Sequence, residues 1–261
     1  MDNRGSGDNH GNGDGAGNTA VAQPWWAVAA LESAARYPGI RLDPAESERA
    51  VAYAHGRPRD DFVAGRMLAR VLAAELLNRA WPGEPTGPGA LDLAQHCPHC
   101  GADGHGTPLL RVPGRGQTFR LSYARASGWL LLALAPGNTR IGADLADLSD
   151  PAFASTGGGR LLEDYAYGPA ERKVLARLDP DSRLRRQAEW WTLKEAVAKA
   201  DGEGLAGAGG IPVVIGRKRH ALLAMPKTRM LGIGPGERDS LGTALPARLV
   251  GSIVWVPPPA G

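Results

Sequence analysis

The sequence predicts an α+β protein, and three observations carry this prediction. Stretches with helical periodicity and stretches typical of strands occur in mixed order, without the regular alternation of a parallel α/β sheet and without a short repeat. The 261 residues are 43% hydrophobic and 22% charged, which is enough to bury the core of one large domain or two small ones. The 36 glycines and 21 prolines predict abundant loops between the elements.

The first 80 residues predict a tail, one undecided segment and one helix. Residues 1–22 are rich in Gly, Asn and Asp and have little to bury, which predicts a disordered tail. Residues 25–37 are apolar, and their spacing fits either a strand or a short helix. In residues 60–80 the apolar side chains recur three to five positions apart, which predicts a helix with one buried face.

The middle of the chain predicts an irregular stretch followed by strands. Residues 82–117 contain repeated prolines and glycines, which break both helices and strand ladders, so a long irregular connection is expected there. Residues 118–123 and 129–135 are typical of strands and flank a short turn, which predicts a hairpin. A third strand is expected over residues 140–145.

The C-terminal part predicts two helices, then strands. Pro169 fits the first turn of a helix that continues through residues 171–178, and a second helix is expected over residues 182–201. A short proline-rich tail covers residues 257–261. The strands expected in this part are residues 211–215, 221–225 and 247–256.

Charge and hydropathy exclude some classes of protein. The net charge of +3 is too small to indicate nucleic-acid binding by itself. No run of about 18 apolar residues occurs, and the first 20 residues hold no apolar stretch, so we expect no membrane span, no signal peptide and a cytoplasmic location.

Two cysteines suggest a separate hypothesis, a zinc site. Cys97 and Cys100 lie among His96, His99 and His105, which could supply nitrogen and sulfur ligands to zinc. A full structural zinc motif would add a second ligand pair with its own short spacing, and this sequence offers single histidines instead. A small zinc-binding and nucleic-acid-binding module is therefore the alternative class that this cluster suggests.

The strongest candidates for chemistry are two acids and a lysine. Glu195 and Lys199 are four residues apart in the predicted helix, so they share one face, either as a solvated ion pair or as part of a site. Asp144 ends an apolar run, where an acid can bind a hard cation or cap a turn. Two carboxylates from different elements, with water and phosphate oxygens, suit Mg²⁺.

Two segments together resemble the signature of the 4′-phosphopantetheinyl transferases: Ile-Gly-Ala-Asp at 141–144 and Trp-Thr-Leu-Lys-Glu-Ala-Val-Ala-Lys at 191–199. The resemblance extends over roughly residues 25–256, and it implies two similar α/β halves, 23–140 and 141–256, forming a pseudo-dimer with the active site at their junction. Further segments are similar to the larger, monomeric surfactin-activator class: residues 64–70, 105–108, 119–122 and 202–205.

The resemblance implies a magnesium-dependent transfer of the phosphopantetheine arm of coenzyme A to a serine of an acyl or peptidyl carrier protein. Such an enzyme serves fatty acid, polyketide or nonribosomal peptide synthesis and needs neither nucleic acid nor a membrane. The resemblance assigns the metal to Asp144 and Glu195, and catalysis to Glu195, Lys199 and Lys194. The residues that it implies for coenzyme A binding are Arg66, Ser122, Tyr123 and Lys199.

Three positions depart from the family pattern. Ala146 stands where a second acid is common, Tyr123 where a histidine is usual, and Thr107 where a cation is usual. Asp147 is one residue beyond Ala146, and in an extended strand it is expected on the opposite face. These departures motivate an alternative function, a catalytically impaired homologue that binds carrier protein or coenzyme A without turnover.

Overall fold

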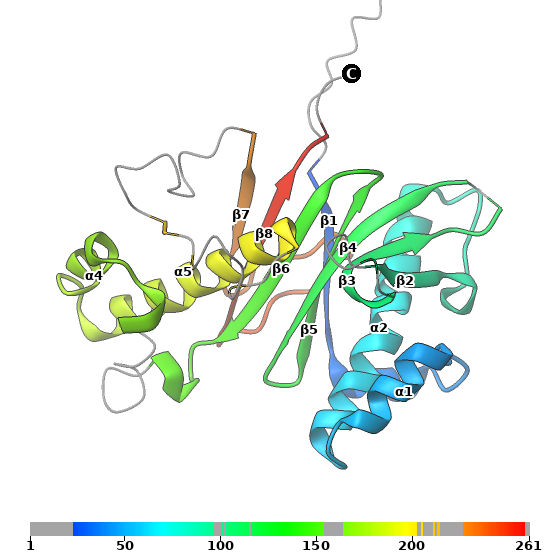
Figure 1. The fold of residues 1–261 in the computed structure, drawn as a ribbon, viewed down its shortest axis with the longest axis horizontal. Coiled ribbons are helices and arrows are strands. Elements are labelled where there is room, and N and C mark those ends of the chain that lie inside the picture. Colours follow the sequence, from blue (N-terminus) through cyan, green and yellow to red (C-terminus); the bar gives the residue numbers. More distant parts are fainter. Residues whose placement is uncertain are drawn as a thin grey trace, which may run out of the picture.

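A computed structural model shows an α+β fold of two antiparallel sheets, stacked face to face, with helices on the outer face of each (Figure 1). This confirms the predicted α+β class. The structure describes residues 23–96, 101, 103–114, 116–153, 164–202, 205, 211, 213–214 and 227–258, with only the backbone described at 96 and 103–105. Residues 1–22, the cysteines at 97 and 100, and the strand expected at 221–225 lie outside this description.

The larger sheet has five strands, and it contains the predicted hairpin as β4 and β5. One face of this sheet packs on a helix and the other on the second sheet, because alternate residues of a strand point to opposite faces. In spatial order its strands are β1 (Trp25–Ala30), β5 (Trp129–Pro136), β4 (Thr118–Ala126), β3 (Asp103–Arg111) and β2 (Asp92–His96).

The expectation of an irregular connection over residues 82–117 was wrong, because β2 and β3 lie within it. The proline in β3, Pro108, pairs with β2 next to a register shift, and the pairing of β3 with β4 begins only at Leu109. A proline is tolerated where a ladder ends or shifts, so it did not exclude a strand here.

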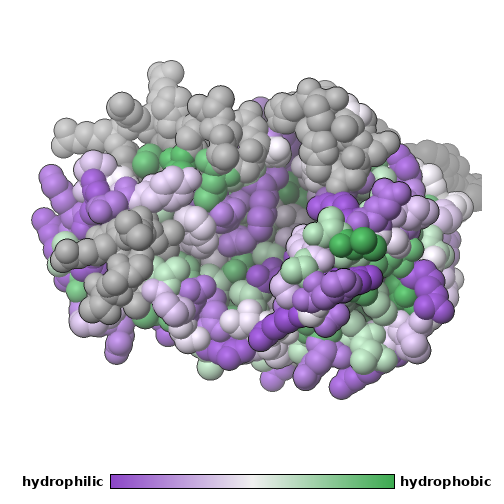
Figure 2. Space-filling view, turned by 60° about the horizontal axis from the view of Figure 1, so that its bottom comes forward, coloured by the Kyte–Doolittle hydropathy of each residue, from purple (hydrophilic) through white to green (hydrophobic). Residues whose placement is uncertain are grey.

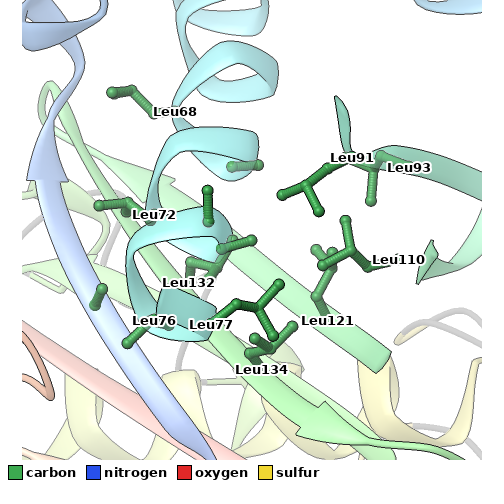
Figure 3. Packing of buried hydrophobic residues seen from close by; sticks show 14 of the residues in the cluster. Leu68, Leu72, Leu76, Leu77, Leu91, Leu93, Leu110, Leu121, Leu132 and Leu134 are labelled. Atoms are coloured by element: carbon green, nitrogen blue, oxygen red, sulfur yellow. The ribbon is translucent and has the colours of Figure 1, made fainter. Parts of the chain in front are cut away.

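The predicted helix over residues 60–80 is confirmed as α2 (Arg57–Ala80), which covers the outer face of the larger sheet. Its leucines meet leucines of β4 and β5 in a buried hydrophobic cluster (Figure 3). Burial of each such side chain stabilises the fold by about 1.5–3 kcal/mol. The undecided segment contains both alternatives, since β1 is followed by a 3₁₀ helix, η1 (Leu31–Arg36).

A further helix that the sequence analysis missed is α1 (Pro44–Ala52). Asp43 caps it by accepting a hydrogen bond from the amide of Glu46, whose carboxylate accepts one in return from the amide of Asp43. This capping box, followed by proline at the first helical position, is a sequence signal that could have predicted the helix.

The smaller sheet has three strands, and it carries the predicted strand that begins at Arg140. The strand β7 was not predicted, and residues 211, 213 and 214, which are described, form no named strand. The strand expected over residues 247–256 is confirmed as β8. In spatial order the strands are β6 (Arg140–Asp147), β8 (Leu249–Val256) and β7 (Arg229–Ile233).

The two predicted C-terminal helices are confirmed as α4 (Pro169–Leu175) and α5 (Pro180–Asp201). Helix α5 packs on the outer face of the smaller sheet, so the two sheets lie between α5 and α2 (Figure 1). Among the described residues no helix is both long and apolar enough to cross a membrane. Short 3₁₀ turns complete the described elements, namely η2 (Pro88–Ala90) and η3 (Pro151–Phe153).

Candidate functional site

The candidate site lies where α5 crosses β6. The Nζ atom of Lys199 donates to Asp144 Oδ1 over 2.6 Å and to the carbonyl oxygen of Ala143 over 3.1 Å. Glu195 is one helical turn before Lys199, and its charge interacts with both Asp144 and Lys199. The structure therefore brings together the two acids and the lysine that the sequence singled out.

Gly142 allows this close approach of helix and strand. A β-carbon at Gly142 would lie 1.8 Å from the carbonyl oxygen of Ala196 and 2.7 Å from the amide nitrogen of Ala200, so no larger residue fits without moving α5. Ala143 packs toward the larger sheet, whereas Gly142 and Asp144 face α5, as the strand alternation requires. The glycine thus positions Asp144 against the helix.

The two carboxylates share one cation. Burial raises the pKa of Asp144, and the ammonium of Lys199 opposes this rise. Burial also raises the pKa of Glu195, the negative charge of Asp144 raises it further, and Lys199 again opposes. Negative charge at this point is therefore only partly compensated by the described side chains.

A divalent cation fits this donor set. Burial raises the pKa of both carboxyl groups, and the charge of Asp144 raises that of Glu195 further, so these hard oxygens gain from an added positive charge. No cluster of three or more His, Cys, Asp or Glu side chains occurs among the residues that the structure describes. Magnesium at Asp144 and Glu195 would therefore need water and phosphate oxygens as its remaining ligands, which is its usual preference.

The acid next in sequence does not join this pair. Ala146 packs with Ala188 of α5, on the same face of β6 as Asp144. Asp147 accepts hydrogen bonds from the amide and hydroxyl of Ser149 and lies 3.4 Å from Nε of Arg248. These contacts on the other face confirm the expected orientation of Asp147.

A cavity of about 320 Å³ adjoins Lys199 and is lined by residues of both sheets. Figure 2 shows one face of the molecule, where the surface is hollowed in the middle and hydrophilic residues lie in the hollow. Of the predicted coenzyme A residues, Ser122, Tyr123 and Lys199 line the cavity and Arg66 does not. The described residues around it are Gln95, Gly106, Thr107, Pro108, Ser122, Tyr123, Ile141, Lys199 and Gly202.

Among the described residues of the cavity wall, Arg66 is hydrogen-bonded to Tyr123. Its guanidinium is buried, forms an ion pair with Glu46 at 2.5 Å, and donates to the hydroxyl oxygen of Tyr123 over 2.7 Å. Desolvation opposes its charge, but Tyr123 and Glu46 together raise the pKa of Arg66. Sequence reasoning missed Glu46, because its partner lies 20 residues away and no local pattern indicates the pair.

Lys194 is not part of this arrangement. Its side chain is fully buried, and Nζ donates to Glu171 over 2.7 Å and to the carbonyl oxygen of Ala166 over 2.6 Å. Burial lowers the pKa of Lys194, and the pairing with Glu171 opposes that. The structure thus directs this predicted catalytic lysine toward α4 and away from Asp144.

Comparison with known proteins adds one match. A sequence model of the 4′-phosphopantetheinyl transferase superfamily matches residues 140–221. No curated protein matches the chain. The matched range begins at the first residue of β6 and includes α5, so Asp144, Glu195 and Lys199 fall within it, whereas Tyr123 lies outside. This supports a transferase domain for which coenzyme A and a carrier protein are the general partners.

Proposed function

We propose that this protein is a magnesium-dependent 4′-phosphopantetheinyl transferase that modifies a serine of an acyl or peptidyl carrier protein. The observation that carries the proposal is the convergence of Asp144 from β6 with Glu195 and Lys199 from α5, beside a cavity lined by both sheets. We assign the chain to the surfactin-activator class, acting as a cytoplasmic monomer, with residues 23–140 and 141–256 as its two related halves.

Asp144 and Glu195 would hold the magnesium ion. When bound, magnesium supplies positive charge that stabilises the pyrophosphate as its bond breaks. The matched stretch of chain and the raised pKa values of both carboxylates support this assignment.

The remaining steps use groups of this chain. Glu195, or a water that it orients, would accept the proton of the carrier serine. The serine oxygen forms a bond to the β-phosphorus, the bond from that phosphorus to the bridging oxygen breaks, and adenosine 3′,5′-bisphosphate leaves. Lys199, whose side chain is 33% exposed, would donate to phosphate oxygens.

The test is intact-mass spectrometry of a panel of apo carrier proteins incubated with this protein, coenzyme A and magnesium, with a chelator control. The proposal requires a chelator-sensitive mass increase of one phosphopantetheine group on at least one carrier. No increase on any carrier, from protein with a cooperative unfolding transition, would refute transferase activity. If that protein still bound coenzyme A, the alternative of a binding homologue without turnover would be supported.

The zinc hypothesis needs a separate measurement, since Cys97 and Cys100 lie outside the described residues. Elemental analysis of purified protein would decide it. About one zinc per chain would support the site, and absence of zinc together with no salt-dependent binding to DNA or RNA would refute the nucleic-acid-binding module.

A further inference from the structure

A second cavity, of about 660 Å³, lies beside the edge strand β1 and shares no described lining residue with the cavity at Lys199. We call it the β1 cavity. Its walls come from β1, η1, α2, the first residue of β5 and two residues of the segment before β8, Leu241 and Thr243. The transfer reaction proposed above uses none of these residues.

The floor of the β1 cavity is apolar. Val28 of β1 and Leu68 and Leu72 of α2 line it, and none of the three is more than 4% exposed. Figure 3 shows Leu68 and Leu72 on the side of α2 that faces β1. The aromatic residues Tyr37 and Trp129 also line the cavity, and the faces of such rings attract organic cations. The cavity therefore suits a ligand with an apolar or aromatic body.

The acids of the wall outnumber its cation. Glu32 of η1 and Glu75 of α2 line the β1 cavity, and Arg36 of η1 is the cation among its described lining residues. Burial raises the pKa of Glu75, the negative charge of Asp239 raises it further, and a hydrogen bond with Tyr37 opposes the rise. The described groups that act on Glu75 are thus a phenol and a second acid, and neither supplies positive charge.

Asp239 lies directly behind the wall of the β1 cavity. It is 7% exposed, and its carboxylate accepts hydrogen bonds from the amides of Val28, Leu241 and Thr243 over 2.8, 2.9 and 2.7 Å. All three amides belong to residues that line the cavity. These bonds fix a negative charge near Glu75, so a positive charge placed beside Glu75 is stabilised by two carboxylates.

We propose that the β1 cavity binds a small organic cation, whose apolar or aromatic body lies on the leucine floor and whose ammonium group lies beside Glu75. A neutral molecule of the same shape gains only the apolar contacts. An anion of that shape is repelled by Glu75 and Asp239. This inference does not depend on the proposed transferase function, because the two cavities have separate walls.

The probe is 2-phenylethylamine, which carries an aliphatic ammonium at pH 7 as lysine does. Neutral 2-phenylethanol and anionic 3-phenylpropionate are the controls of similar shape. Each is titrated into the ¹⁵N-labelled full chain, and amide NMR shifts give the Kd. The amine should shift the amides of Leu241 and Thr243 and bind at least about fivefold more tightly than the alcohol. Equal affinity for the three probes, or shifts confined to other parts of the chain, would overturn the proposal.

Charge-neutralising variants test the wall itself. Glu75→Gln should weaken binding of the amine by about fivefold and leave binding of the alcohol unchanged. Glu48→Gln is the matched control, because it removes one exposed negative charge from α1, outside the β1 cavity, and should change neither affinity. Glu32→Gln is a second test if Glu75→Gln folds poorly.

Two further results would overturn the proposal. One is an unchanged Kd for the amine in both folded variants, Glu75→Gln and Glu32→Gln. The other is a dimer in sedimentation that shifts the amides of Leu241 and Thr243 with protein concentration in the absence of any probe, because the cavity would then belong to an interface with a second copy.

Discussion

Two lysine–carboxylate pairs on helix α5 have nearly the same length and opposite surroundings. Lys194 lies 2.7 Å from Glu171, and Lys199 lies 2.6 Å from Asp144. The first pair is fully buried, and Glu171 also accepts hydrogen bonds from the amides of Gly168 and Val214.

The second pair borders the cavity, and its side chains are 33% and 11% exposed. Glu195 adds a second negative charge beside Asp144, and Lys199 opposes the rise in the pKa of both carboxyl groups. We call the Lys194–Glu171 pair the closed pair and the Lys199–Asp144 pair the open pair. The closed pair has its charges satisfied by the fold, whereas the open pair retains unmet negative charge where a ligand can reach it.

The largest expected effect is a loss of transferase activity when Glu195, the acid beside the open pair, is changed. Glu195→Gln should lower the transfer rate by about 10²–10⁴-fold, because the charge that binds the metal and accepts the proton is lost while the side chain keeps its shape. The measurement is the rate of carrier modification by intact mass. Its unfolding transition should match that of the wild type, and a near-normal rate would contradict the role of the open pair.

For the free energy of unfolding, the larger effect is expected at the closed pair. Lys194→Met leaves the buried charge of Glu171 uncompensated, so the free energy of unfolding should fall by about 3–5 kcal/mol. Lys199→Met, the control in the open pair, should cost less, because the side chain of Lys199 is 33% exposed whereas that of Lys194 is fully buried. Urea unfolding followed by tryptophan fluorescence measures both, and equal losses would mean that the closed pair is not structural.

The contact of α5 with β6 can be tested without changing any charge. Gly142→Ala inserts a methyl group where backbone atoms of α5 already lie, so it should lower the free energy of unfolding by about 1–3 kcal/mol and reduce the transfer rate as Glu195 moves away from Asp144. Gly232→Ala on β7 is the control, since a β-carbon there meets nothing within 4 Å. If both variants behave alike, close packing at Gly142 does not position the site.

The smallest effect is a shift in the pH profile. Glu195 must be ionised to act as a base, and its raised pKa means that kcat/KM falls on the acid side at a higher pH than for an ordinary glutamate. Magnesium favours the ionised form of both carboxylates, so raising its concentration should move this acid limb to lower pH. Profiles at two magnesium concentrations check this, and a shift to higher pH would have the wrong sign.

Much of the fold was predictable because its signals are local. The apolar period of α2 and the β4–β5 hairpin needed only neighbouring residues. The strands β2 and β3 were missed because a proline such as Pro108 is normally a strand breaker, and only the pairing register shows that it is tolerated.

The candidate site was predictable in part. Glu195 and Lys199 are about 40° apart around the helix axis, so the sequence could place them together. Lys194 and Lys199 are about 140° apart on the same count, a separation that the sequence analysis did not use when it placed both lysines in one site. The pairing of Arg66 with Glu46 and Tyr123 depends on tertiary contacts, and no local pattern reports it.

The central claim is that the open pair forms a metal site together with Glu195, and binding of Mn²⁺, measured by electron paramagnetic resonance with and without coenzyme A, tests it without relying on turnover. The account predicts one bound Mn²⁺ per chain in the wild type, with binding lost in Asp144→Asn. Binding should be retained in Asp147→Asn, the same chemical change three residues along the same strand and on its other face. Equal binding by both variants, or no binding by folded wild-type protein, would contradict the account.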